Sequence, residues 1–198
     1  MPRRFSLPIL LCAVGAAWCN AQATVFYDEF HQGDLSGDRF APTPFTLGAG
    51  DNELIGVMAG VNGLGQVDRD YFSLTIPSGF VLAHATLEQY ISVDFTAFIG
   101  IQPGPVFPDD PATVSPGDLL GWAHFGPSDV NFDLLAEMGI NGQTFSPPLP
   151  AGTYSFWAQQ LDDNTDYEVD FVVSPVPAPA SVAIFGVGSV WFGARRRR

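Results

Sequence analysis

The chain has 198 residues, enough for one domain of ordinary size with further segments at its ends. It contains 21 glycines, 17 prolines and no lysine, and only 15% of its residues are charged, which favours short strands joined by turns over long helices. The net charge is −13 although four of the eight basic residues close the chain, and so acidic a body argues against binding to the phosphates of nucleic acid.

Residues 1–23 have the three parts of a secretory signal peptide. Two arginines near the start precede an apolar run over residues 7–18, and Ala21 and Ala23 form a small-x-small cleavage site. The apolar run is too short for a comfortable membrane span. We therefore predict a signal helix that signal peptidase removes after Ala23. Both cysteines lie within it, so the mature protein would have no thiol and no disulfide.

The body of the chain, residues 24–173, has the pattern of short strands. Residues 167–171 give the clearest case, because Tyr167, Val169 and Phe171 alternate with acidic residues, as on a strand with one buried face. The expected strands are residues 25–28, 53–58, 70–76, 80–90, 92–101, 119–125, 153–159 and 167–171. The expected turns are residues 77–79, 103–105, 116–117 and 150–152. One or two helical turns are expected over residues 133–138.

This number of short strands predicts an all-β fold, an antiparallel β-sandwich of jelly-roll type. Two phrases carry a resemblance that agrees with it. Residues 68–79, DRDYFSLTIPSG, and residues 149–157, LPAGTYSFW, resemble the strand-and-turn motifs of bacterial pre-peptidase C-terminal domains. That resemblance implies a non-catalytic module of the kind that accompanies secreted proteases and polysaccharide-degrading enzymes.

Two acidic clusters could hold Ca²⁺, which prefers several hard oxygen ligands. Asp28, Asp34 and Asp38 stand with Glu29 around two glycines near the start of the body. Asp162, Asp163 and Asp166 lie in a predicted hairpin loop. Asp68 and Asp70 would join the first cluster if their strand lies next to it. Neither cluster has the spacing of an EF-hand, and the alternative is that these acids are solvated turn residues.

The sequence offers little support for catalysis. The three histidines lack the spacing of a zinc protease, and neither a nucleophile elbow nor a phosphate-binding loop is present. Trp122 and His124 are expected on one face of a strand. Trp157 is expected on the face opposite Tyr154 and Phe156, where an exposed indole could stack on a sugar ring.

Residues 174–198 form a distinct C-terminal segment of three parts. Val176, Pro177, Ala178 and Pro179 lead into an uncharged run over residues 181–194, which Arg195, Arg196, Arg197 and Arg198 close. As a helix the run would rise only about 21 Å, against the roughly 30 Å of a bilayer core. The arginines would remain on the cytoplasmic side. A short hydrophobic helix that anchors the chain for a time in the inner membrane is therefore expected.

The order of a proline motif, a short apolar helix and a terminal arginine cluster resembles the PEP-CTERM sorting signal. In that family the second residue of the proline motif is usually Glu, whereas this chain has Ala178. The resemblance implies an exosortase, a membrane protease-transpeptidase, as the processing partner. The alternative is a fortuitous single-pass anchor.

The sequence thus favours an exported, non-catalytic structural or interaction protein, sorted to the cell surface or exterior. The rival is a module that binds extracellular polysaccharide, with Trp122 and Trp157 as the stacking residues and Ca²⁺ as a stabiliser. An enzyme is the third class.

Overall fold

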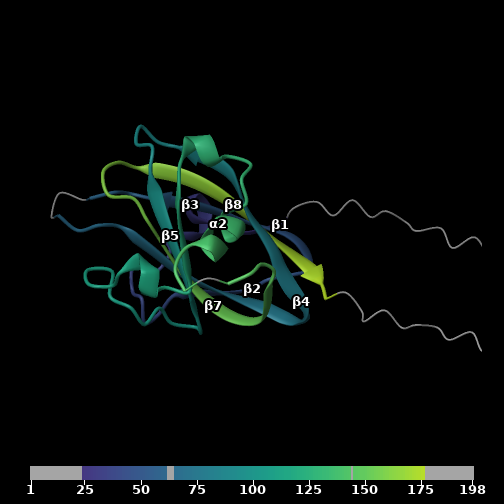
Figure 1. Ribbon diagram of the computed structural model, residues 1–198. Coiled ribbons are helices and arrows are strands. Elements are labelled where there is room, and N and C mark those ends of the chain that lie inside the picture. Colours follow the sequence, from purple (N-terminus) through teal and green to yellow (C-terminus); the bar gives the residue numbers. More distant parts are fainter. Residues whose placement is uncertain (1–23, 62–64, 144, 177–198) are drawn as a thin grey trace, which may run out of the picture.

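The computed structural model describes residues 24–61, 65–143 and 145–176 (Figure 1). The signal peptide and almost all of the sorting segment, with their two expected helices, lie outside the described residues. Most of the described chain is in strands. The strands are β1 Thr24–Asp28, β2 Thr43–Thr46, β3 Gly50–Met58, β4 Arg69–Ile91, β5 Ala97–Pro103, β6 Gly121–Phe125, β7 Leu149–Gln159 and β8 Thr165–Pro175. The helices are α1 Glu29–Gln32 and α2 Leu134–Ile140, with 3₁₀ turns η1 Pro116–Asp118 and η2 Pro127–Asp129.

The strands form one hydrogen-bonded sheet in the order β1-β3-β8-β4-β7-β5-β6, and β2 pairs with β4 outside this path. Most neighbours are antiparallel, as expected, but β1 pairs in parallel with β3 and β2 in parallel with β4. The sheet is therefore mixed, and the prediction of a purely antiparallel one is wrong. The strand β2 was not predicted at all.

The long strand β4 joins the two halves of the sheet. Its first part, residues 69–76, pairs with β7, and its second part, residues 80–91, pairs with β8, while Val81 and Leu82 also pair with β7. Two predicted turns, residues 77–79 and 150–152, lie at this junction and are wrong as chain reversals. Instead the register between β4 and β7 shifts there, so that both strands continue through an irregularity.

The main core lies where the two halves of the sheet face each other. Phe171 of β8 packs against Phe72 of β4 and Phe156 of β7, with ring centroids 6.1 and 5.8 Å away. Phe125 of β6 reaches Tyr167 of β8, four places along the sheet order, at 6.3 Å. These contacts show that the sheet curls around a common aromatic core.

A second, smaller cluster covers the other face of β4, β5 and β7. It consists of Tyr71, Phe98, Phe107, Leu119 and Trp157. Phe107 and Leu119 belong to the connection between β5 and β6, which folds back across these strands. Both faces of the strands are consequently covered there.

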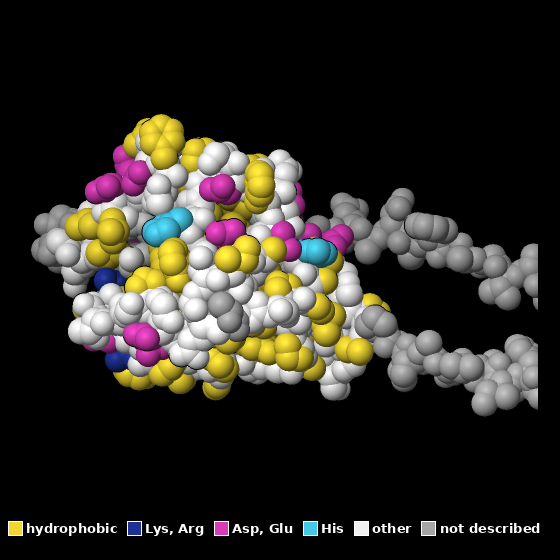
Figure 2. Space-filling model, in the orientation of Figure 1, with side chains coloured by type: hydrophobic (Ala, Val, Ile, Leu, Met, Phe, Trp, Pro, Cys, Tyr) yellow, Lys and Arg dark blue, Asp and Glu magenta, His cyan; other side chains and the backbone are white. Residues whose placement is uncertain are grey.

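The helix α2 follows Asp133, as expected from residues 133–138. The Asp133 carboxylate accepts hydrogen bonds from the backbone N–H of Leu135 and of Ala85, both at 3.0 Å. It therefore caps the helix and attaches it to β4. Acidic side chains are spread over the face shown in Figure 2, whereas basic ones are confined to one edge of it.

Candidate cation centre

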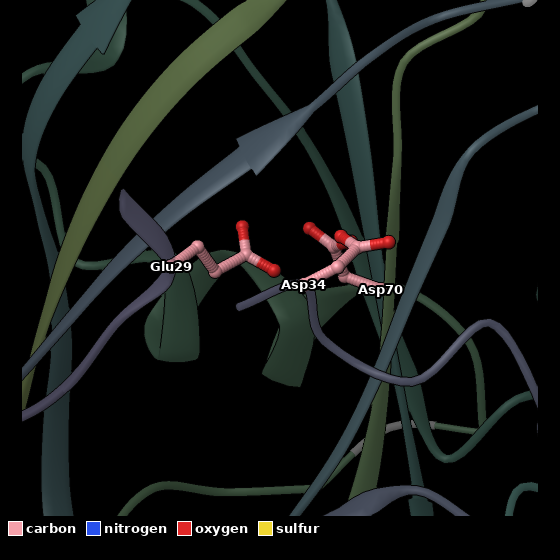
Figure 3. Close-up of side chains that lie close together, drawn as sticks. All are labelled: Glu29, Asp34 and Asp70. Atoms are coloured by element: carbon pink, nitrogen blue, oxygen red, sulfur yellow. The ribbon is translucent and has the colours of Figure 1, made fainter. Parts of the chain in front are cut away.

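Three carboxylates converge between the start of the chain's body and strand β4. Glu29 is the first residue of α1, Asp34 lies in the loop that follows, and Asp70 is in β4. One oxygen from each lies within 4.8 Å of the others (Figure 3). Within the described residues this is the single group of three or more acidic, histidine or cysteine side chains so arranged.

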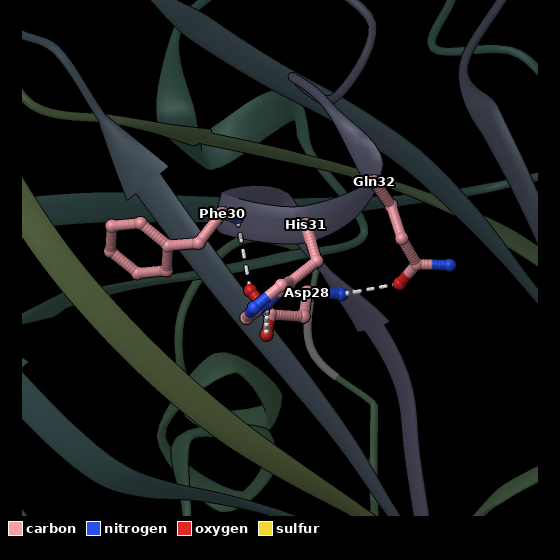
Figure 4. Close-up of polar contacts among 4 residues, drawn as sticks. All are labelled: Asp28, Phe30, His31 and Gln32. Atoms are coloured by element: carbon pink, nitrogen blue, oxygen red, sulfur yellow. Dashed lines mark hydrogen bonds and ion pairs between the residues drawn. The ribbon is translucent and has the colours of Figure 1, made fainter.

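Glu29 begins the short helix α1, and polar contacts among its neighbours hold this turn in place (Figure 4). Asp28 caps the short helix α1, because its carboxylate accepts the backbone N–H of Phe30 at 3.0 Å and lies 2.6 Å from His31 Nδ1. The backbone N–H of Asp28 donates in turn to the Gln32 side chain at 2.8 Å. This reciprocal capping fixes the turn between β1 and the acidic loop.

Glu29 is buried and held by two backbone donors. One carboxylate oxygen accepts the N–H of Leu35 at 2.5 Å, and the other accepts the N–H of Val57 in β3. These two bonds position the carboxylate, and each oxygen keeps further lone pairs for a ligand.

Asp70 is the unusual member, because its carboxylate is fully buried and only half satisfied. One oxygen accepts the hydroxyl proton of Tyr167 at 2.8 Å. The other, Oδ1, is inaccessible to solvent and has no hydrogen-bond partner among the described residues. A buried charged oxygen without a partner is strongly unfavourable. It therefore points to a ligand bound at this position in the folded protein.

Among the described residues, no basic side chain forms an ion pair with the carboxylates of Glu29, Asp34 or Asp70. The two ion pairs among the described residues, His31–Asp28 and His84–Asp133, lie outside the group. Burial is accordingly the largest cause of a raised pKa for Glu29, to about 7, and of a pKa well above the ordinary value for Asp70. Burial, followed by the negative charge of Asp68, also raises the pKa of Asp34.

Asp34 is exposed and provides access from solvent. A surface hollow of about 330 Å³ opens beside it, lined also by Glu29 and Asp68. The carboxylate of Asp68 accepts the backbone N–H of Ala59 at 2.7 Å. A divalent cation could reach the group from this side, with water completing its coordination.

The donor set fits Ca²⁺ best. All the candidate ligands are carboxylate oxygens, Ca²⁺ accepts irregular geometry, and Mg²⁺ requires a near-octahedral site with several waters. The absence of nitrogen or sulfur donors disfavours Zn²⁺.

The structure brings together only part of the predicted acidic clusters. Asp34 lies in the group with Glu29, and Asp70 joins them from the neighbouring strand, as the sequence had suggested. Asp28 and Asp38 are not members. Asp28 caps α1, and Asp38 accepts the backbone N–H of Phe40 at 2.9 Å in its own turn.

The second predicted cluster, Asp162, Asp163 and Asp166, does not form a convergent group either. The backbone N–H groups of Asp162 and Asp163 donate to the Gln160 side chain, which orders the loop without bringing its carboxylates together. The contribution of Tyr167 was missed, since a tyrosine at an inward-facing strand position gives no sign of the carboxylate that it meets.

The two predicted stacking residues, Trp122 and Trp157, differ in how the structure surrounds them. Trp122 and His124 lie side by side as expected, with ring centroids 5.3 Å apart. Trp157 is on the predicted face, but only 4% of it is exposed, because Phe107 and Leu119 cover that face. The prediction of Trp157 as an exposed stacking platform is therefore wrong.

Comparison with known protein families, with curated proteins and with solved structures finds no match for this chain. In the part of the chain that the structure describes, no helix has the length and apolar character needed to cross a membrane.

Proposed function

We propose that this chain is an exported, non-catalytic interaction protein whose β domain is stabilised by one Ca²⁺ ion bound by Glu29, Asp34 and Asp70. The observation that carries the cation site is the buried, unpartnered Oδ1 of Asp70, at the convergence of three carboxylates. The ion would tie α1, the acidic loop and strand β4 together. Its role would be structural, because both deeper ligands are buried and lie at the edge of the core.

The proposed site has a direct test in calcium binding by the protein after treatment with a chelator. Calorimetry should show one Ca²⁺ per chain. At a free concentration about 100 times the dissociation constant, the melting temperature should rise by roughly 5–10 °C. Asp70→Asn should abolish binding, because it removes the buried charge that faces the ion.

The matched control is Asp163→Asn, which removes an exposed acid outside the group. It should bind Ca²⁺ as the unaltered protein does. Equal binding by Asp70→Asn and the unaltered protein, or no binding by either, contradicts the proposed site.

We further propose that the domain belongs to the jelly-roll class of sandwiches. The chain would be exported through its signal peptide, and an exosortase-type enzyme would process its C-terminal segment. The arrangement of the domain ends supports the two-ended processing. Thr24 pairs with Asn52, which pairs with Phe171 of β8, so the two ends of the described domain lie on the same side (Figure 1). Removal of either end segment would leave the paired strands complete.

Intact-mass analysis of the protein from its native host tests the processing. The mature protein should begin at Thr24 and lack Arg195 to Arg198. A mass that includes the four terminal arginines on membrane-extracted protein would contradict removal of the tail, and would leave the cation site unaffected.

A further inference from the structure

A groove of about 660 Å³ lies between helix α2 and strand β6, and none of the residues that line it belongs to the cation centre. Strand β6 is the last strand in the sheet order and pairs with β5, so it forms one edge of the sheet. We call this hollow the α2–β6 groove and define it by Trp122, His124, Asp129, Phe132, Glu137 and Ile140.

The apolar side chains of the α2–β6 groove are open to solvent. Phe132 is 61% exposed and Ile140 is 71% exposed. Trp122 is half-buried, because its ring stacks on Phe98 with the ring centroids 6.1 Å apart, and it also borders the groove. Large exposed apolar side chains that are rimmed by polar ones are typical of a surface that binds another protein.

The charged side chains of the groove are acidic. Glu137 is exposed on α2, and Asp129, at the end of the turn η2, is half-buried. No arginine lines the groove, and neither carboxylate takes part in an ion pair among the described residues. Asp133 lines the groove as well, but its carboxylate caps α2 and lies 2.8 Å from His84 Nδ1. The groove therefore offers two carboxylates without a cationic partner, next to aromatic rings.

The dimensions of the groove suit an extended peptide. Helix α2 rises about 10 Å from its cap, Asp133, to Ile140, and Phe132 comes just before the cap. Glu137 thus lies between two exposed apolar side chains. In an extended chain alternate side chains point the same way, and residues four positions apart are separated by about 13 Å. Two apolar residues with a basic residue midway between them would match this order along the groove.

We propose that the α2–β6 groove binds an extended segment of a partner protein in which an arginine or lysine is flanked by apolar residues. The cationic side chain would pair with Glu137 and Asp129 and contact the ring of Trp122, an arrangement that favours a cation. The apolar side chains would pack on Phe132 and Ile140. The segment would run along β6, since the edge of a sheet can accept an extended chain.

This proposal rests on the interaction role proposed above and gives that role a surface. It uses none of the residues of the cation centre.

Two other occupants fit the groove less well. A neutral sugar needs hydrogen-bond donors as well as acceptors, and the Asn141 amide that lines the groove already donates to Glu137 at 3.1 Å. An acidic segment would be repelled, because between residues 24 and 194 the chain has only two basic residues, Arg39 and Arg69, against 21 acidic ones.

The test is calorimetric titration of the chain with acetylated, amidated peptides of the form Leu-Ala-X-Ala-Leu, in which X is arginine, lysine, citrulline or glutamate. The arginine and lysine peptides should bind. Citrulline keeps the shape of arginine but has no charge, so its peptide should bind severalfold more weakly, and the glutamate peptide should not bind. Raising the salt concentration from about 50 to about 500 mM should weaken binding of the two basic peptides, because salt screens exposed charge pairs.

Variants of exposed residues locate the binding without disturbing the fold. Glu137→Gln should weaken binding of the arginine peptide about three- to fivefold, with no change in melting temperature. The matched control is Glu88→Gln, the same change at an exposed acid of β4 outside the groove, which should leave the affinity unchanged. Ile140→Ala should also weaken binding severalfold, whereas Val93→Ala, at a side chain that is 76% exposed outside the groove, should not.

Three results would overturn the proposal. They are absence of binding by both basic peptides, equal binding by the citrulline or glutamate peptide, and unchanged affinity in both Glu137→Gln and Ile140→Ala. The basic peptides should still bind to Asp70→Asn, so failure of the cation site and failure of the groove are distinguishable.

Discussion

Metal-free protein is expected to be more stable near pH 5 than near pH 8, and saturating Ca²⁺ is expected to reverse that order. The reason is the acidic group at Glu29, Asp34 and Asp70, in which the pKa of each carboxyl is raised in the folded protein. Thermal unfolding at the two pH values, with chelator or with Ca²⁺, measures the effect.

The direction follows from proton linkage. A carboxyl whose pKa is higher in the folded state binds its proton more tightly there, so protonation favours folding. For Glu29 the pKa rises from 4.5 to about 7, and the stability present below pH 4.5 is therefore lost as the pH rises through about 7. Calcium competes with these protons and requires the ionised carboxylates, so its contribution increases over the same interval.

A second set of acidic residues, on the outer face of β3 and β8, also makes the metal-free protein less stable as the pH rises. Its contribution must be distinguished from that of the cation centre. A hydrogen bond to Glu53 is the largest cause that raises the pKa of Glu168 to about 7, and burial raises that of Asp170 to about 6. Glu168→Gln should reduce the pH dependence and leave the Ca²⁺ response intact. Asp70→Asn should lose the Ca²⁺ response. A calcium-dependent gain that is equal at both pH values would contradict the carboxylate site.

Local patterns in the sequence predicted correctly those features that depend on a single strand or turn. Tyr167, Val169 and Phe171 are buried as their alternation predicts, and Asp133 caps a helix as its position suggests. Alternation also assigned Trp157 to the correct side of its strand. It could not show that this side is covered, because the cover comes from Phe107 and Leu119, about 50 and 40 residues earlier in the chain.

Pairing between segments that are distant in sequence explains the other differences between the predicted and the observed structure. Pro77, Ser78 and Gly79 have the composition of a turn, yet β4 continues because β7 bends with it and supplies partners on both sides of the irregularity. The cation centre likewise depends on contacts between segments that are distant in sequence. Glu29 and Asp34 are close in sequence, but Asp70 joins them only because Ser36, in the loop after α1, pairs with Tyr71 of β4. Asp28 has the same chemistry as its neighbour and is used instead as a helix cap.

Phe171→Ala is expected to cause the largest loss of stability, about 3–5 kcal/mol in the free energy of unfolding. Phe171 is fully buried, and its ring lies 6.3 Å from Phe26, 6.1 Å from Phe72 and 5.8 Å from Phe156. These residues come from both halves of the curled sheet, so truncation leaves a cavity that neither half can fill alone. Urea unfolding in saturating Ca²⁺ measures the loss with the cation site held constant.

The matched control is Phe132→Ala, at a phenylalanine that is 61% exposed. Its truncation removes the same atoms but leaves no cavity in the core, so the change should stay within about 0.5 kcal/mol. A domain of this size has a typical stability of about 5–15 kcal/mol, so the core variant should lose a large fraction of it. Similar losses in the two variants would mean that the aromatic contacts between the halves of the sheet do not hold the fold together.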